Sequence, residues 1–241
     1  MWLSPPSIVC SPSIHEVHLW RTNLDLQIEQ IQELAQLLCA DEKNRAARFY
    51  FEQHRNRFIV ARGQQKVILG NYLGIAPTQI EFVYSSRGKP NLAPSCNGKR
   101  LQFNVSHSQD LALYGFACDR AIGVDLEYLR PMDDANQIAQ RFFSARESAT
   151  IKSLPEPEKS LAFFQVWTAK EAYLKATGDG IGSSLDRVEI SFLPNEPLRL
   201  LAVDGDEEAA ARWRLDSLTP AANYIATIAV EGHDWVLSCW H

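Results

Sequence analysis

Hydrophobic and polar residues follow two different periods along the first part of the chain. In residues 14–20, IHEVHLW, they alternate, and this pattern predicts a strand. In residues 24–39 the apolar side chains recur at helical spacing, so a helix is expected there. Residues 41–72 are also broadly helical, and Asp41 is a suitable N-cap. The chain is therefore predicted to begin with one strand followed by helices.

Strands and helices then follow in the same order a second time. Short strands are predicted at residues 78–84, 101–108, 111–117 and 121–129, helical patterns run from Pro131 to Gly178, and further strand candidates close the chain. Because the two element types cluster without strict alternation, the sequence predicts an α+β fold and not a doubly wound parallel sheet. The similar layouts predict one subdomain at residues 1–118 and a second at residues 119–241.

Composition narrows the class of protein. The chain has 241 residues, 46% of them hydrophobic, which is enough for a sizeable core, and its net charge is −5. An acidic chain is not expected to coat nucleic acid, although a local basic site for a small phosphorylated ligand stays open. Neither a signal peptide nor a membrane span is expected. Five scattered cysteines without a CxxC pair indicate reduced thiols in a cytoplasmic protein.

Two acidic residues share one face of the predicted strand 121–129. The period of two places Ile122, Val124 and Leu126 on one side, and Asp125 and Glu127 on the other. Two carboxylates this close to each other suit Mg²⁺, whose coordination shell a substrate phosphate would complete. The alternative is an exposed edge strand with two solvated acids.

A helix predicted over residues 161–178 carries Trp167, Glu171 and Lys175 at intervals of four, so the three stack on one face. Taken alone, Glu171 and Lys175 could equally form a surface salt bridge. Upstream, Ser144 and Glu147 fit a capping box, which assigns Glu147 to structure and not to chemistry.

Polar residues also gather at the exit of the strand 101–108. Ser106 and His107 could donate hydrogen bonds to a phosphate, or His107 could be an ordinary loop histidine. The sequence has no Gly-x-Ser-x-Gly, P-loop or GxGxxG motif, so a serine hydrolase and the commonest nucleotide folds are not supported. Basic residues concentrate in 43–62, where a solvated helix face is the usual explanation.

Several sequence elements stand in a fixed order: Arg45 with Arg48-Phe49, Arg87-Gly88-Lys89-Pro90, Phe103-Asn-Val-Ser-His107, Ile122-Gly-Val-Asp-Leu-Glu127, Arg141-Phe-Phe-Ser144 and Trp167-Thr-Ala-Lys-Glu-Ala-Tyr-Leu-Lys175. In this combination the chain resembles the 4′-phosphopantetheinyl transferases of the long, pseudo-dimeric surfactin-synthetase type, over residues 41–182. The resemblance implies two similar α+β subdomains in a pseudo-twofold arrangement. Each would be a small antiparallel sheet with a long helix, with coenzyme A in the cleft between them.

The resemblance also implies roles for single residues. Asp125, Glu127 and Glu171 would hold Mg²⁺, with Mn²⁺ as an alternative. Glu171, directly or through a water, would help to deprotonate the serine of a carrier protein. Lys175 would stabilise charge on the pyrophosphate and protonate the leaving 3′,5′-ADP.

The implied coenzyme A contacts are spread over both halves. The phosphate ligands would be Arg45, Lys89, Ser106 and His107, the adenine side would meet Arg87 and Gly88, and the pyrophosphate would meet Asp125 and Lys175. One element departs from the family pattern. The basic pair ahead of Arg48 is only approximated by Lys43 and Arg45.

These inferences predict a cytoplasmic, monomeric, Mg²⁺-dependent transferase. It would move 4′-phosphopantetheine from coenzyme A to a serine of an apo acyl carrier protein or carrier domain, with no nucleic-acid or membrane partner. Two alternatives stay open. One is a phosphohydrolase or nucleotidyl transferase that forms product without a carrier protein. The other is a non-catalytic carrier-binding module, against which the intact acidic and basic positions argue.

Overall fold

The computed structural model describes residues 2–6, 10–96, 100–179, 185–192 and 197–241. Its first half contains β1 (Glu16–Asn23), α1 (Ile28–Gln36), α2 (Ala40–Ala47), α3 (Glu52–Leu73), a 3-10 turn (Pro77–Gln79), β2 (Phe82–Tyr84), β3 (Pro90–Leu92), β4 (Leu101–Ser108) and β5 (Leu111–Cys118).

The second half repeats the succession of strand, helices and strands. It contains β6 (Ile122–Tyr128), α4 (Ala135–Phe142), α5 (Ala145–Ser153), α6 (Glu156–Thr177), a 3-10 turn (Leu185–Arg187), β7 (Val188–Ser191), β8 (Arg199–Val203), α7 (Glu207–Ala211), β9 (Trp213–Leu218), β10 (Tyr224–Glu231) and β11 (Val236–Trp240).

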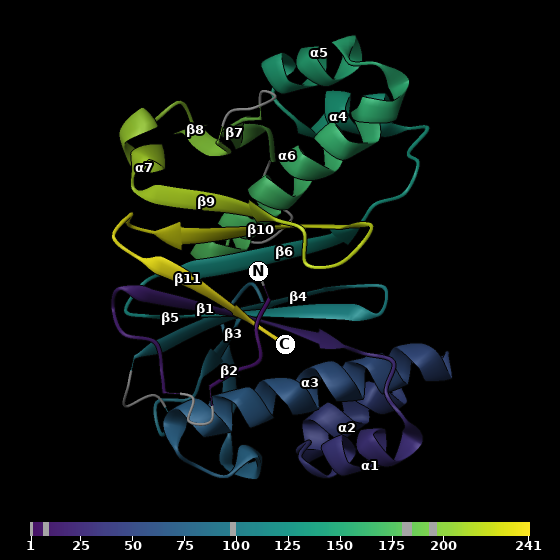
Figure 1. The fold of residues 1–241 in the computed structure, drawn as a ribbon, viewed down its shortest axis with the longest axis vertical. Coiled ribbons are helices and arrows are strands. Elements are labelled where there is room, and N and C mark those ends of the chain that lie inside the picture. Colours follow the sequence, from purple (N-terminus) through teal and green to yellow (C-terminus); the bar gives the residue numbers. More distant parts are fainter. Residues whose placement is uncertain (1, 7–9, 97–99, 180–184, 193–196) are drawn as a thin grey trace.

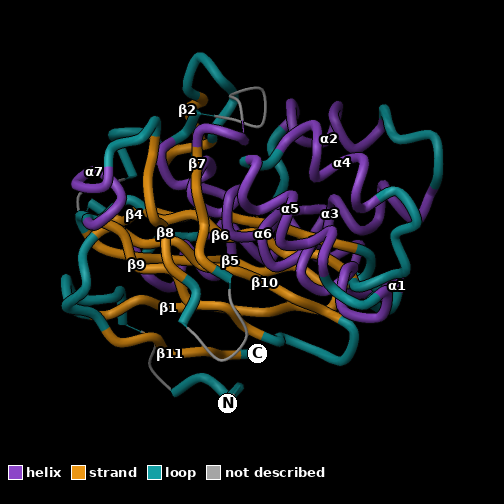
Figure 2. Tube along the Cα trace, turned by 90° about the horizontal axis from the view of Figure 1, so that it is seen from above, coloured by secondary structure: helices purple, strands orange, loops and turns teal. Residues whose placement is uncertain are grey.

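The two larger sheets lie between two groups of helices, which gives four layers (Figure 1), and β2-β3 and β7-β8 form two small two-stranded sheets. One sheet has the order β11-β1-β5-β4 and is flanked by α1, α2 and α3, whereas the other has the order β6-β10-β9 and is flanked by α4, α5 and α6. Seen from above, the strands of both sheets run across the molecule in broadly the same direction (Figure 2). The predicted α+β class is confirmed.

Alternation along the strands builds the core between the two sheets. Val17 and Leu19 of β1 meet Val124 and Leu126 of β6 in one buried cluster, as the period of two predicts for the apolar face of β6. Strand β5 is buried on both faces, because its opposite face packs against α3 in a second cluster. The opposite face of β6 therefore points toward α6.

Several predicted element boundaries differ from the structure, and three of the differences concern the first half. The helix expected over 41–72 is two helices, α2 and α3, separated by residues 48–51, and neither Gly nor Pro marks the break. The cap of α2 is Cys39 and not Asp41, since Glu42 reaches back to the Cys39 backbone N–H at 2.9 Å. The strand expected over 78–84 is reduced to β2 by the preceding 3-10 turn.

The last strand connects the two halves. β11 pairs in parallel with β1, so the first sheet is mixed. The prediction of a purely antiparallel sheet was wrong for this half. The second sheet is antiparallel throughout. The division into subdomains at residues 1–118 and 119–241 stays a prediction. β11 lies after residue 118 in the chain but belongs to the sheet of the first half. No helix in the described part of the chain is long and apolar enough to cross a membrane.

A glycine allows α6 to lie directly on β6. A Cβ atom added at Gly123 would stand 1.9 Å from the carbonyl oxygen of Ala172 and 2.5 Å from the backbone nitrogen of Ala176, both on α6. Since real Cβ atoms do not approach backbone this closely, only glycine fits between the strand and the helix. The same helix ends at Gly178, whose φ of 81° is the left-handed cap that its position predicted.

We expect Gly123→Ala to destabilise the fold strongly, because the added methyl group would push α6 away from β6. The free energy of unfolding, measured by urea denaturation, should fall by at least about 3 kcal/mol. Gly74→Ala is the matched control. A Cβ added at Gly74 would meet open space, but the φ of 70° there is left-handed. This variant should therefore lower the free energy of unfolding by only about 1 kcal/mol. Equal losses in the two variants would contradict the close packing.

Candidate active site

The two sheets meet where β4 lies beside β6, and side chains join them there. β4 and β6 belong to different sheets, and polar side chains at every second position of β4 accept hydrogen bonds from backbone N–H groups of β6. The bonds run from Val124 N to Asn104 Oδ1 (2.9 Å), from Leu126 N to Ser106 Oγ (3.2 Å) and from Tyr128 N to Ser108 Oγ (3.1 Å). This arrangement satisfies buried N–H groups of an unpaired strand edge.

Ser106 links this seam to the charged residues. Besides accepting from Leu126, its hydroxyl oxygen accepts from Nζ of Lys175 at 3.0 Å, and its O–H donates to Oδ1 of Asp125 at 3.1 Å. The Lys175 ammonium also pairs with the same Asp125 oxygen at 2.6 Å. β4, β6 and α6 each contribute one residue, so three elements fix the geometry of this triad.

Glu171 and Glu127 complete the acidic group. Both line the same cavity as Asp125, Lys175 and Trp167, as the predicted strand face and helix face require. Burial first, and then the negative charge of Asp125, raise the pKa of Glu171 to about 7, against an opposing effect of Lys175. Burial and Asp125 also raise the pKa of Glu127. The cavity therefore concentrates more negative charge than its single ammonium balances.

The chemistry of these donors fits a hard divalent cation. Oδ2 of Asp125 and Oε1 of Glu171 are buried and have no hydrogen-bond partner among the described residues. Free carboxylate oxygens beside one another are the ligands that Mg²⁺ prefers. Within the described ranges, no three His, Cys, Asp or Glu side chains stand as a ready-made metal site. The metal role of Asp125, Glu127 and Glu171 thus stays a prediction that their chemistry favours.

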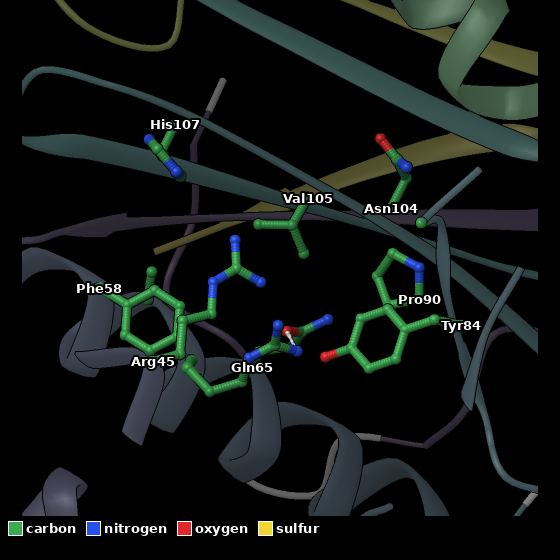
Figure 3. A pocket seen from close by; sticks show the side chains of 11 residues that line it. Arg45, Phe58, Gln65, Tyr84, Pro90, Asn104, Val105 and His107 are labelled. Carbon is green, nitrogen blue, oxygen red and sulfur yellow. Dashed lines mark hydrogen bonds between the residues drawn. The ribbon is translucent and has the colours of Figure 1, made fainter. Parts of the chain in front are cut away.

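A second cavity lies on the other side of His107. Arg45 of α2, Gly88 of the β2–β3 turn and His107 of β4 line it together with Phe58 and Tyr84 (Figure 3). His107 also lines the acidic cavity, so it stands between the two spaces. Surrounding atoms remove part of the hydration of its imidazole and nearby cations add positive charge, and both effects lower its pKa.

Two of the predicted coenzyme A ligands are engaged elsewhere. Nζ of Lys89 donates to the carbonyl oxygen of Ala176 at 2.7 Å, and burial lowers its pKa to about 8. The Arg87 guanidinium pairs with the Asp179 carboxylate at 2.6 Å. Both cations therefore fasten the β2–β3 turn to the end of α6, and neither is among the residues that line the two cavities. Gly88 of the same turn does line the second cavity.

The structure thus divides the predicted residues into groups. The acidic cavity contains Ser106, His107, Asp125, Glu127, Glu171 and Lys175, and the neighbouring cavity contains Arg45, Gly88 and His107. Among the residues of the second cavity that sequence reasoning missed are the polar residues Arg62, Gln65 and Asn104. Asn104 could have been found from its spacing, because it shares a strand face with Ser106. Gln65 has no signal in the sequence.

The two lysines of the α6 motif have different surroundings. Lys170 is completely buried and pairs with Glu147 at 2.7 Å, and it also donates to the carbonyl oxygens of Leu185 and Val188. Glu147 accepts from the Ser144 backbone as well, which confirms the predicted capping box and its structural role. Lys170 therefore holds α5, α6 and β7 together, whereas Lys175 faces the acidic cavity.

We expect Lys170→Met to destabilise the protein by about 3–5 kcal/mol, because it leaves the Glu147 carboxylate buried without its cation. Lys175→Met, which truncates a partly exposed lysine on the same helix, should cost much less. Chemical denaturation of both variants measures the difference. A larger loss for Lys175→Met would contradict the assignment of these lysines.

Comparison with known proteins identifies the family to which the chain belongs. A sequence model of the 4′-phosphopantetheinyl transferase superfamily matches residues 121–229, and a model of the N-terminal part of 4′-phosphopantetheinyl transferases matches residues 25–116. The 4′-phosphopantetheinyl transferase HetI of Nostoc sp. is 47% identical over 100% of this chain and 98% of its own length. A putative 4′-phosphopantetheinyl transferase of Synechocystis sp. is 35% identical over 75% of this chain and 72% of its own length.

Solved structures of holo-[acyl-carrier-protein] synthases align with part of the chain. The Bacillus anthracis protein is 22% identical, with a TM-score of 0.39 over 47% of this chain and 96% of that one. The sequence matches are stronger and extend over both halves. On their evidence the chain belongs to the 4′-phosphopantetheinyl transferases, and it is a transferase, as its sequence elements predicted.

Proposed function

We propose that this transferase takes 4′-phosphopantetheine from coenzyme A and attaches it to a serine of an apo acyl carrier protein or carrier domain, releasing 3′,5′-ADP. One observation carries the assignment of roles. Asp125 and Glu171, each with an unpartnered buried carboxylate oxygen, line a cavity that His107 joins to a second cavity lined by Arg45. A site for a metal and a pyrophosphate thus lies beside a site for a nucleotide.

The second cavity is proposed to hold the nucleotide. The cationic Arg45 and the polar imidazole of His107 give it an end suited to a phosphate, Arg62 lines it as a second cation, and Gly88 and Tyr84 supply an uncharged end suited to a base. Arg87 and Lys89 keep the turn that carries Gly88 against α6. We therefore assign them a positioning role, and direct contact of either with coenzyme A stays a prediction.

Asp125, Glu127 and Glu171 are proposed to hold Mg²⁺, with Mn²⁺ as an alternative. When bound, the metal would neutralise charge on the pyrophosphate oxygens as the displacement proceeds. Three carboxylates around one ammonium leave an excess of negative charge that a divalent cation would balance. Ser106 and Lys175 hold Oδ1 of Asp125 and leave Oδ2 available as a ligand atom.

Proton transfer is assigned to Glu171 and Lys175. Oε1 of Glu171 is unpartnered and its pKa is raised to about 7, so it can accept the proton of the carrier serine. The serine oxygen then attacks the β-phosphorus of coenzyme A, and the bond from that phosphorus to the oxygen of the leaving 3′,5′-ADP breaks. The Lys175 ammonium can stabilise or protonate this leaving oxygen.

We also propose that the enzyme acts as a monomer in the cytoplasm. β4 and β6 lie on the same chain, so a single copy contributes both sides of the seam along which the cavities lie. Cys10, Cys39, Cys96 and Cys239 are free thiols, which suits a reducing compartment.

Intact mass spectrometry of a carrier protein tests the reaction. Purified enzyme with apo acyl carrier protein, coenzyme A and Mg²⁺ should add one phosphopantetheine to the carrier, and chelating the metal should abolish the addition. Asp125→Asn should reduce the rate by at least about a hundredfold, because it removes a metal ligand and the partner of Lys175. Asp133→Asn, in an exposed turn, is the matched control and should react like the wild type. Cleavage of coenzyme A without a carrier would instead favour a phosphohydrolase.

Steady-state kinetics separate the roles proposed for Lys175. Lys175→Ala should lower kcat by at least about a hundredfold while KM for coenzyme A changes little, because the ammonium acts mainly on charge that develops during displacement. A rise in KM with unchanged kcat would make Lys175 a binding residue. A melting curve of the variant shows whether the fold is intact.

A further inference from the structure

A buried glutamine in the second cavity takes no part in the roles assigned above. Gln65 of α3 is only 3% exposed and lines the cavity with Arg45, Tyr84 and Pro90. Its amide nitrogen has no hydrogen-bond partner among the described residues. Buried amide N–H groups are normally paired, so an unpaired one that faces a cavity indicates a partner supplied by a ligand.

The orientation of this amide is fixed by a neighbouring guanidinium. Nη1 of Arg62 donates to Oε1 of Gln65 at 2.9 Å. Because a guanidinium has donors and no acceptor, the amide oxygen must face Arg62, which lines the same cavity, and the N–H groups point away from Arg62. A flipped amide would place donor against donor.

Arg62 is itself held in place. Its guanidinium lies 3.5 Å from the buried carboxylate of Glu42 and stacks over the ring of Phe82 at 4.6 Å. The Glu42 carboxylate also pairs with Lys66 at 3.0 Å. Arg62 and Gln65 are thus the members of a buried polar chain that reach the cavity wall, and Gln65 presents a donor there without a net charge.

The two ends of the cavity differ in chemistry, and this difference identifies the partner. The cationic Arg45 and the polar imidazole of His107 form one end, whereas Tyr84 and Pro90 form the uncharged end, and the Arg62 guanidinium also lines the cavity. In Figure 3 the amide nitrogen of Gln65 is directed toward Tyr84 and Pro90. A neutral donor between an aromatic ring and a proline suits the edge of a nucleobase better than a phosphate.

We propose that Gln65 is a specificity-determining residue that donates its side-chain N–H to a hydrogen-bond acceptor on the base of the bound nucleotide, with Arg62 as the residue that positions it. The inference rests on the proposed function, which places the nucleotide of coenzyme A in this cavity. In adenine the ring nitrogens N1, N3 and N7 are all acceptors, so more than one edge of the base can meet this donor.

Calorimetric titration of the full chain tests the proposal with two probes, 3′,5′-ADP and 5′-AMP. Gln65→Met, which removes the donor at similar size, should weaken binding of both probes by about tenfold, the factor for one lost hydrogen bond. Gln64→Met is the matched control. It makes the same change at the neighbouring position of α3, outside the residues that line the cavity, and should bind as the wild type does.

Each result distinguishes between possible contacts of Gln65. Equal affinity of Gln65→Met and wild type for both probes would overturn the proposal. A loss confined to 3′,5′-ADP would overturn the assignment to the base, since the contact would then be with the 3′-phosphate. If the wild type binds neither nucleotide, the proposed function fails and the inference fails with it.

Two further variants guard against an effect of folding. Gln65→Glu keeps an acceptor for Arg62 but presents oxygen in place of the N–H, so it should also lose affinity for both probes. If only Gln65→Met lost affinity, the donor would not be the cause. Arg62→Met alone should weaken binding of both probes, and adding it to Gln65→Met should cause no further loss of affinity. Additive losses would contradict positioning through Gln65.

Discussion

The arrangement of the whole molecule depends on how β6 satisfies its backbone. Its carbonyl and N–H groups pair with β10 on one side. On the other side the N–H groups of alternate residues donate hydrogen bonds to the side chains of Asn104, Ser106 and Ser108 of β4. Side chains replace the backbone ladder that would otherwise join two strand edges. This seam holds the two sheets together and also brings polar groups of both halves to one line. The two cavities open along that line.

Residues along the seam therefore serve stability and chemistry together. Ser106 accepts from the backbone of β6 and also contacts Asp125 and Lys175, so its replacement would alter both. Other charged residues act in the fold alone. The Glu147–Lys170 pair holds α5, α6 and β7, although Lys170 stands next to Glu171 in the sequence. Adjacent positions of one helix thus face different surroundings, and the period of 3.6 separates them.

The sequence predicted what local periodicity determines. The period of two placed Asp125 and Glu127 on one face of β6, the spacing of four placed Glu171 and Lys175 on one face of α6, and both faces line one cavity. It did not predict what depends on contacts distant in the chain. The pairing of β11 with β1, the attachment of Arg87 and Lys89 to the end of α6, and the buried position of Gln65 all require the tertiary structure. The break between α2 and α3 lacks the glycine or proline that would mark it.

Unpaired polar atoms give an independent indication of where a ligand binds. Folded proteins pair nearly all buried polar groups, because an unpaired one loses its hydration without compensation. In the described part of the chain, four buried side-chain atoms have no partner, on Gln65, Asp125, Asn136 and Glu171. Three of these four residues line the two cavities that share His107. Two of the atoms are acceptors that a cation would satisfy, and the third is a donor that a base would satisfy. The fold thus carries unfavourable desolvation at those positions where coenzyme A and its metal would supply the missing partners.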